Sequence, residues 1–210
     1  MMNAKRTAIV LAGALGLPVL TVLPATAAPA APDNISIDVV SINGSGCPAG
    51  TASAVFSPDR TDFTITYSDF LVSVGGNAPP TAQKNCQISL RINAPGYTYA
   101  VEGLDHQGFA NMSLGASGTE QTYLTFEGSS QSQQIGGWSR GGLSVGEWIF
   151  YDWVGPRARV WKPCGEDRNL NINTVLLVKT ESSDNAKMSF MSMDSTHSNL
   201  RDRFVWGPCP

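Results

Sequence analysis

The sequence has few charged residues, and those it has are not arranged to hold a polyanion. Charged residues make up 15% of the 210 residues. Lysine and arginine form no cluster along the chain. Without a basic patch there is no electrostatic means of retaining nucleic acid or an anionic membrane surface. We therefore expect no nucleic-acid partner.

Two further shortages concern membrane spans and helices. After the first 30 residues no run is apolar enough to cross a bilayer, so we expect no membrane insertion. No window of useful length repeats apolar residues at the 3.6-residue spacing of a helix with capping residues at both ends. This excludes helical bundles and α/β folds.

The first residues have the composition of a secretory signal. Lys5 and Arg6 precede an apolar segment that ends at Leu23. Ala25-Thr26-Ala27 then supplies the small-x-small pattern of a cleavage site, with cleavage after Ala30 as the alternative. The sequence thus predicts a secreted, extracellular protein.

The predicted organisation is a signal peptide at 1–27, a short disordered leader at 28–33 and a single domain at 34–210. Lys5 and Arg6 leave with the signal, so the 14 basic residues fall to 12. Against 17 acidic residues, the mature chain has a net charge of 12 − 17 = −5. A mature chain of this length suits one domain with a sizeable core.

The four cysteines all lie in the predicted mature chain. An even number of cysteines in an exported protein indicates two disulfides. Three pairings are possible, and we favour Cys47–Cys86 with Cys164–Cys209 because each then closes a local loop. The spacings are unlike the paired C-x-x-C units of zinc sites.

The mature chain consists of short alternating segments separated by turn residues. One clear case is the segment from Cys86 to Asn93, where apolar and polar residues alternate. Strands about ten residues apart indicate an all-β fold, an antiparallel β-sandwich or a related barrel, with a jelly roll as one form and little or no helix. The region 128–146, rich in Ser, Gln and Gly, is predicted to be the least regular, and 158–161 is predicted to be a strand.

The segment 161–178 combines a cysteine, a charged turn and the longest strand signal. Along its strand the alternate residues should share one face. These residues are Leu170, Ile172, Thr174, Leu176 and Val178. The asparagines between them should form a polar row on the opposite face.

Several blocks in series resemble one protein family. They are Gly44–Thr51, Tyr67–Phe70, Lys84–Gln87, Pro163–Gly165, Arg168–Thr174 and Met193–Ser195. Together they resemble DUF4360, a domain of unknown function in small exported proteins of actinobacteria and fungi. The resemblance covers nearly the whole mature chain. It implies an exported, disulfide-bonded single domain and supplies no activity and no catalytic residues.

The candidate ligand-binding residues combine an aromatic ring with polar side chains. Trp138, in a Gly-rich segment with Arg140 beside it, is the tryptophan most expected to be exposed. Tryptophans are more often core residues, but an exposed one can stack on a sugar ring. The polar candidates are Glu166, Asp167, Asn169, Asn171 and Asn173. A structural corner, with Arg168 satisfying the acids, is the plainer interpretation of the charged turn.

Two catalytic patterns are present and weak. Gly142-Leu143-Ser144-Val145-Gly146 matches G-x-S-x-G, but a strand-like aromatic run follows it instead of a helix. His106 and His197 each have an aspartate nearby that could orient the imidazole. A glycosidase could also pair loop carboxylates, with Asp105, Glu147 or Asp152 as partners of the charged turn.

We therefore predict a non-catalytic extracellular binding module, with polysaccharide or a cell-surface molecule as its ligand and no cofactor or metal. One alternative is a secreted hydrolase that uses loop carboxylates or the His106/His197 pair. Another is an extracellular inhibitor or a structural protein of the cell envelope. The sequence leaves the oligomeric state open.

Overall fold

Alternating apolar and polar residues turn most of the chain into strands. The computed structural model describes residues 31–180 and 187–210. The single helical element in this part is a short 3-10 turn, η1 (Pro156–Ala158). The strands are β1 (Ser36–Asn43), β2 (Ala52–Phe56), β3 (Asp62–Tyr67), β4 (Leu71–Val74), β5 (Thr81–Asn93), β6 (Tyr97–Val101), β7 (Gly103–Met112), β8 (Ala116–Phe126), β9 (Ser132–Gly141), β10 (Ser144–Trp153), β11 (Leu170–Thr180), β12 (Ser189–Asn199) and β13 (Phe204–Pro208).

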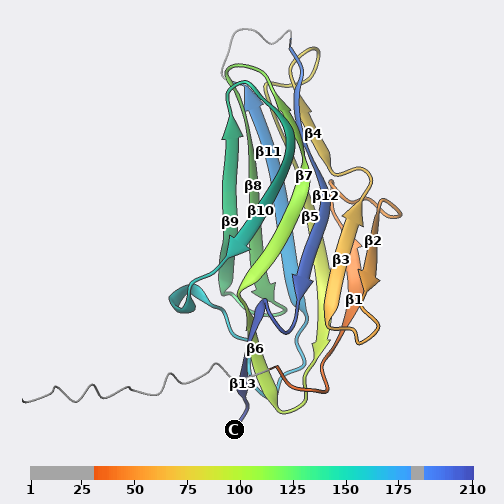
Figure 1. Ribbon diagram of the computed structural model, residues 1–210, viewed down its shortest axis with the longest axis vertical. Helices are drawn as coiled ribbons and strands as arrows, with labels where there is room; N and C mark the ends of the chain where they lie inside the picture. Colours follow the sequence, from red (N-terminus) through yellow and green to blue (C-terminus); the bar gives the residue numbers. More distant parts are fainter. Residues whose placement is uncertain (1–30, 181–186) are drawn as a thin grey trace, which may run out of the picture.

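Two antiparallel sheets pack face to face and form a β-sandwich (Figure 1). The first sheet has the strand order β1-β5-β11-β8-β9. The second has the order β10-β7-β12-β3-β2, and β4 pairs with β12 beside it. The chain passes repeatedly from one sheet to the other, so neighbouring strands are often distant in sequence. The predicted fold class is confirmed.

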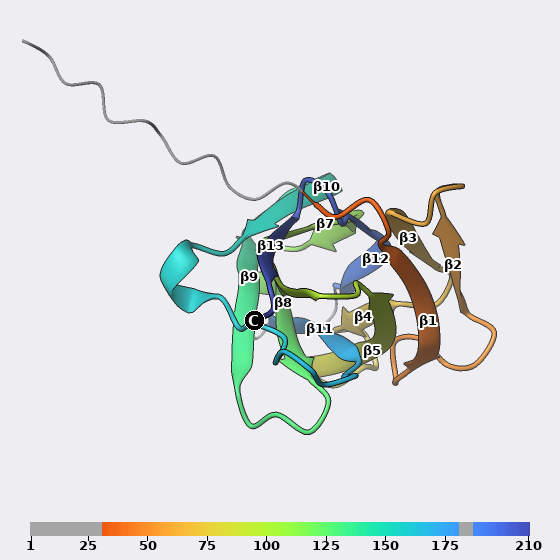
Figure 2. The same cartoon turned by 90° about the horizontal axis from the view of Figure 1, so that it is seen from below.

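A small third sheet closes one end of the sandwich. β6 pairs with β13, and the two strands lie across the opening between the larger sheets (Figure 2). Their aromatic side chains point inward, with the Tyr99 ring 5.4 Å from Trp206 and 5.7 Å from Phe204. The Trp206 indole donates a hydrogen bond to the Leu200 carbonyl over 2.7 Å, which satisfies its polar group in the core.

The central strand β11 confirms the predicted alternation. Leu170, Ile172, Thr174, Leu176 and Val178 are all buried between the sheets. Each strand that flanks β11 pairs with it over nearly its whole length. Burial of such a row of aliphatic side chains stabilises the fold by about 1.5–3 kcal/mol per residue.

Both predicted disulfides are present. Cys47 bonds to Cys86, and Cys164 bonds to Cys209. The second bond ties the chain just before β11 to the C-terminal end of β13, and so holds the end-closing sheet in place.

Two local predictions are wrong. The region 128–146 is mostly strand, because β9 spans Ser132–Gly141 and β10 begins at Ser144. Residues 158–161 form no strand, because Ala158 ends η1 and 159–161 follow it; Pro156 fixes a backbone angle that suits a 3-10 turn. The predicted signal peptide lies outside the described residues. In the described part, no helix has the length and apolarity to cross a membrane.

Candidate functional site

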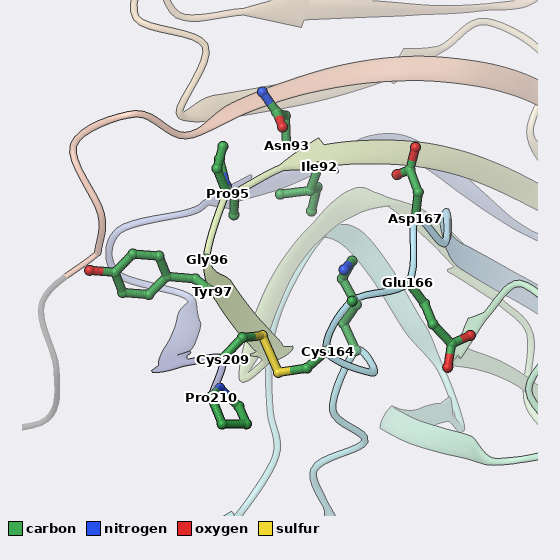
Figure 3. A pocket seen from close by; sticks show the side chains of 13 residues that line it. Ile92, Asn93, Pro95, Gly96, Tyr97, Cys164, Glu166, Asp167, Cys209 and Pro210 are labelled. Atoms are coloured by element: carbon green, nitrogen blue, oxygen red, sulfur yellow. A yellow bond between two sulfur atoms is a disulfide. The ribbon is translucent and has the colours of Figure 1, made fainter.

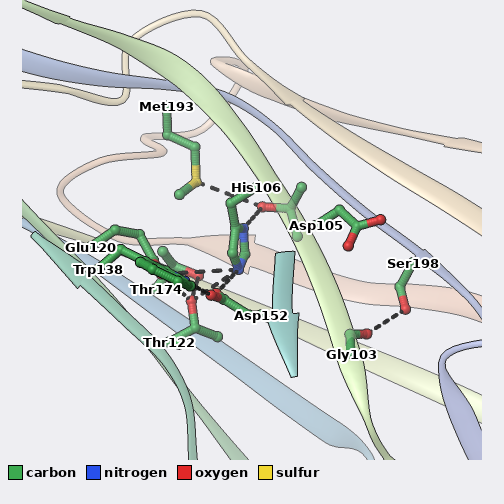
Figure 4. A network of polar contacts seen from close by, with 12 residues as sticks. Gly103, Asp105, His106, Glu120, Thr122, Trp138, Asp152, Thr174, Met193 and Ser198 are labelled. Carbon is green, nitrogen blue, oxygen red and sulfur yellow. Dashed lines mark hydrogen bonds and ion pairs between the residues drawn. The ribbon is translucent and has the colours of Figure 1, made fainter. Parts of the chain in front are cut away.

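Three ionisable side chains meet between the two sheets. His106 comes from β7, Glu120 from β8 and Asp152 from β10 (Figure 4). All three are buried, with exposed fractions of 0%, 0% and 1%. Charged side chains are rarely enclosed in this way without a partner that compensates the lost hydration.

The atoms that these side chains direct at one another lie close together. His106 Nε2 is 3.4 Å from Asp152 Oδ2 and 3.9 Å from Glu120 Oε1. One donor atom from each residue falls within 4.8 Å of the other two. Glu120 Oε2 and Asp152 Oδ2 are buried and have no hydrogen-bond partner.

Threonine hydroxyls on the inner faces of the strands orient the cluster. Thr196 Oγ1 lies 3.0 Å from His106 Nδ1 and fixes the ring on that side. Thr122 donates to Glu120 Oε1 over 2.6 Å, and its Oγ1 lies 2.8 Å from the hydroxyl of Thr174 on β11. Thr122 Oγ1 is also 3.2 Å from His106 Nε2. The network therefore joins both sheets.

Burial shifts the pKa of each of the three side chains in the direction that favours its uncharged form. Loss of water, together with the neighbouring Asp152 carboxylate, raises the pKa of Glu120 to about 8. Burial likewise raises the pKa of Asp152 to about 6, against the indole hydrogen bond of Trp138, which lowers it. Burial lowers the pKa of His106 to about 3. A cluster with such shifted groups is a functional-site candidate.

Trp138 covers the cluster at the edge of the sandwich. Its indole Nε1 donates to Asp152 Oδ1 over 2.6 Å. Its ring stacks on Phe150, with centroids 5.5 Å apart, and Phe150 stacks in turn on Trp148 at 4.6 Å. The indole is 49% exposed, so one of its faces is open to solvent, as predicted.

An extra residue in β9 puts Trp138 in this position. The register with β8 shifts between Glu120 and Thr122, where β9 has one residue more than β8. Gly136 and Gly137 adopt positive φ angles of 80° and 131° there. A β-bulge of this kind re-aims a side chain, here the indole of Trp138 toward Asp152.

A hollow of about 340 Å³ lies beside the covered cluster. Its lining residues are Gly136, Gly137, Trp138, Tyr151, Asp152 and Trp153. Tyr151 and Trp153 are 62% and 55% exposed. Tyr151 and Trp153 alternate with Asp152 along β10 and lie on its outer side, whereas Trp138 stacks on the inward Phe150. We call the space that the three aromatic residues line the aromatic hollow.

The charged turn lines a different hollow, of about 650 Å³, next to the Cys164–Cys209 disulfide (Figure 3). Glu166 and Asp167 are both exposed on it. Arg168 donates to Glu166 over 2.5 Å and to the Glu127 carbonyl over 2.9 Å. The predicted structural corner is therefore present.

The predicted asparagines lie apart from Trp138. Asn169 donates to Glu127 Oε2 over 2.8 Å at the end of β11. Asn171 and Asn173 lie on the outer face of the first sheet, where Asn85 donates to Asn173 over 3.2 Å. The side chain of Arg140 lies outside the described part of the structure.

Strand register shows how far apart the predicted binding residues are. Trp138 pairs with Glu120, which pairs with Leu176, six residues along β11 from Leu170. At about 3.3 Å per residue, this separates Trp138 from the charged turn by roughly 20 Å. The predicted residues thus form two separate hollows and one polar sheet face.

The His106/His197 pair is not brought together. His106 pairs across the strands with Thr196, whereas His197 pairs with Asp105. Neighbouring positions on a strand face opposite sides of the sheet, so the two imidazoles point in opposite directions. His197 Nδ1 instead lies 3.0 Å from the Thr64 hydroxyl. A site shared by both histidines was a wrong hypothesis.

The G-x-S-x-G match lies where β9 turns into β10. Ser144 begins β10, so a ten-residue strand follows it directly. The strand-to-helix turn that activates such a serine is therefore lacking there, as the sequence indicates.

Sequence reasoning considered His106 and Asp152 separately and missed Glu120. Glu120 is the inward-facing acid in a strand whose alternate positions are buried, a polar residue at a core position. Such a breach of the alternating pattern is a signal that the sequence does contain. The partners of Glu120 could not be identified without knowing how the strands pair.

The fold, the disulfides and the covered polar cluster define a class of protein, the disulfide-bonded β-sandwiches of secreted proteins. More specifically, the chain belongs to the family described as a domain of unknown function, DUF4360, which it matches over residues 33–209.

One relative is an uncharacterized secreted protein of Arthroderma benhamiae, 30% identical over 182 residues that cover 85% of this chain and 73% of the relative. The protein is secreted, and its disulfides agree with an extracellular location. Among solved structures, TmCBM61 in complex with beta-1,4-galactotriose is similar at a TM-score of 0.29 and 8% identity, over 80% of this chain and 88% of that one. A similarity this low carries no argument about a ligand.

The bulge glycine Gly136 provides a first prediction. A Cβ there would lie 2.3 Å from Asp152 Oδ2, and its φ of 80° disfavours other residues. Gly136→Ala should cost about 1–3 kcal/mol more free energy of unfolding than Gly142→Ala. Gly142, at a φ of 75° with open space around it, is the matched control for backbone strain. Urea unfolding measures both, and equal losses would contradict the close packing at Asp152.

The pH dependence of stability provides a second prediction. Glu120 holds a proton in the folded state that the unfolded chain releases above its ordinary pKa of 4.5, so stability falls from there to about pH 8. Asp152, whose pKa rises from 3.8 to about 6 on folding, lowers stability in the same way as the pH rises between those two values. His106, lowered from 6.5 to about 3, has the opposite effect between those values.

Between pH 6.5 and 8 only the Glu120 contribution remains among the three. Unfolding free energy should then fall by up to about 1.4 kcal/mol per pH unit. Glu120→Gln should flatten this slope. Urea unfolding with a chelator present measures it, and a slope that survives in the variant would contradict the assignment to Glu120.

Proposed function

We propose that the protein is a non-catalytic extracellular binding module that holds a neutral polysaccharide in the aromatic hollow. The observation that carries the proposal is that three partly exposed aromatic residues line one hollow. Trp138, Tyr151 and Trp153 are each about half exposed, although large aromatic side chains are ordinarily buried. The nonpolar face of a pyranose ring packs well against such rings.

The polar groups of the hollow suit hydroxyl-rich ligands. Gly136 and Gly137 carry no side chain, so their backbone groups face the hollow directly. Tyr151 and Trp153 add a hydroxyl and an indole N–H. A few placed polar groups among aromatic walls are the usual composition of a small-molecule site.

Charge favours a neutral ligand. The predicted mature chain is acidic, and Asp152 lines the hollow itself. An anionic polymer would be repelled by the acidic surface and would find no basic cluster. Uncharged glycans avoid both costs.

A hydrolase has less support. The carboxylates of Glu120 and Asp152 lie within 4.8 Å of each other through the cluster, but their residues are 0% and 1% exposed. A general acid must come within hydrogen-bond reach of the bond it cleaves. With Trp138 in place, the enclosed carboxylates are not open to a glycosidic oxygen.

The test is retention of the secreted protein on a panel of insoluble neutral polysaccharides. Tyr151→Ala and Trp153→Ala should each weaken retention on the bound polysaccharide about tenfold or more, since a stacked aromatic contributes about 1–3 kcal/mol. Trp161→Ala removes a tryptophan of 39% exposure that does not line the hollow and serves as the matched control.

Asn171→Ala and Asn173→Ala locate the site by comparison. If these variants lose retention while Tyr151→Ala and Trp153→Ala keep it, the ligand binds the outer sheet face and the proposed site is wrong. Absence of retention on every polysaccharide of the panel would contradict the proposed function itself.

A further inference from the structure

We propose that His106, Glu120 and Asp152 bind a divalent first-row transition-metal ion, with zinc as the representative, inside the sandwich behind Trp138. The proposal concerns a site beside the aromatic hollow and does not depend on which ligand the hollow binds.

The spacing of the donor atoms fits such an ion. Bonds of about 2.0–2.2 Å from zinc to nitrogen and oxygen place neighbouring tetrahedral donors roughly 3.4 Å apart. His106 Nε2 lies 3.4 Å from Asp152 Oδ2 and 3.9 Å from Glu120 Oε1. The three donor atoms all lie within 4.8 Å of one another and would draw together to share one ion.

The cluster also has unused bonding capacity. Asp152 Oδ2 and Glu120 Oε2 are fully buried oxygens that no other side chain or backbone group donates to, and the two carboxyl groups interact with each other there. In the described part of the chain, no lysine or arginine forms an ion pair with either carboxylate. A buried unpaired oxygen costs about 1–3 kcal/mol or more when charged, and a divalent cation would compensate two carboxylates at once.

The remaining atoms of these side chains are already oriented as a metal site requires. A ligating histidine ordinarily anchors its second ring nitrogen, and here Nδ1 faces the Thr196 hydroxyl at 3.0 Å. Trp138 holds Asp152 Oδ1 and leaves Oδ2 directed at the imidazole. Thr122 donates to Glu120 Oε1, the oxygen nearer the imidazole, and leaves Oε2 without such a donor.

The donor types select the ion. One imidazole nitrogen with two carboxylates suits zinc and its first-row neighbours. Calcium takes six to eight oxygen ligands in an open site, and magnesium keeps several waters, so neither fits this enclosed mixed set.

The aromatic hollow is the side from which an ion could enter the cluster. Asp152 lines both the hollow and the cluster. Gly136 has no side chain between them, and a Cβ there would collide with the Asp152 carboxylate. Because the Gly136 backbone packs against that carboxylate and Asp152 is 1% exposed, an ion enters here only when Trp138 or the bulge moves aside.

The experiment titrates Zn²⁺ and, as a spectroscopic probe, Co²⁺ into the chelator-treated secreted protein. We expect one ion per chain, a rise of several degrees in melting temperature and cobalt absorption bands typical of mixed nitrogen and oxygen ligands. Ca²⁺ at the same concentration should produce no such change. Metal analysis of the protein purified without chelator measures occupancy directly.

Variants assign the ligands. Glu120→Gln and Asp152→Asn keep side-chain shape and should weaken Zn²⁺ binding more than 100-fold, as should His106→Gln. Thr196→Val, which removes the partner of Nδ1 together with that of the buried Tyr67 hydroxyl, should weaken it about tenfold. The chain has two histidines, so His197→Gln is the matched control and should bind like the original protein.

Several results would overturn the proposed metal site. If the protein binds neither Zn²⁺ nor Co²⁺, or if folded Glu120→Gln binds them as well as the original protein, the proposal is overturned. Loss of binding in His197→Gln alone would place the ion on the outer sheet face and would also overturn it. Because Glu120→Gln is nearly isosteric, the test does not depend on His106→Gln folding.

Discussion

The interaction on which the site depends is the enclosure of two carboxylates and one imidazole between the sheets. Each of these groups would be well hydrated in the unfolded chain, and folding removes that water. The fold offsets the loss with threonine hydroxyls from both sheets and with the indole of Trp138. Two carboxylate oxygens remain without a partner, and this deficit is what a bound cation would remove.

The same cluster explains the irregular edge of the first sheet. A regular β9 would not direct an indole at Asp152, and the extra residue at Gly136 and Gly137 does so. The ring that covers the acid then becomes one wall of the aromatic hollow. The covered cluster and the exposed hollow therefore share two residues, Trp138 and Asp152, and a change in one should be felt in the other.

Much of the fold follows from the alternation of residue types. The period of two in β11 identifies its buried face, because a one-residue slip would expose every aliphatic side chain. The disulfides follow from loop lengths once export is inferred. The sequence around the bulge at Gly136 predicts an irregular segment, because a Gly-rich strand has too few side chains to show the period of two.

The site is less predictable, because it is assembled from pairings that sequence does not state. His106, Glu120 and Asp152 lie on three strands from both sheets. Trp138 was predicted to be exposed for the correct local reason, its glycine neighbours. Its neighbours in space, however, are Asp152, Tyr151 and Trp153, whereas the charged turn lines a separate hollow. Spacing along the chain does not contain that information.

The most direct measurement of the central claim is an anomalous-diffraction map of crystals grown with Zn²⁺, recorded on both sides of the zinc edge. The account predicts one strong peak inside the sandwich, about 2.0–2.2 Å from His106 Nε2 and from an oxygen of each of Glu120 and Asp152. A map with no peak there, and with the two carboxylates hydrogen-bonded to each other through a shared proton, would contradict it.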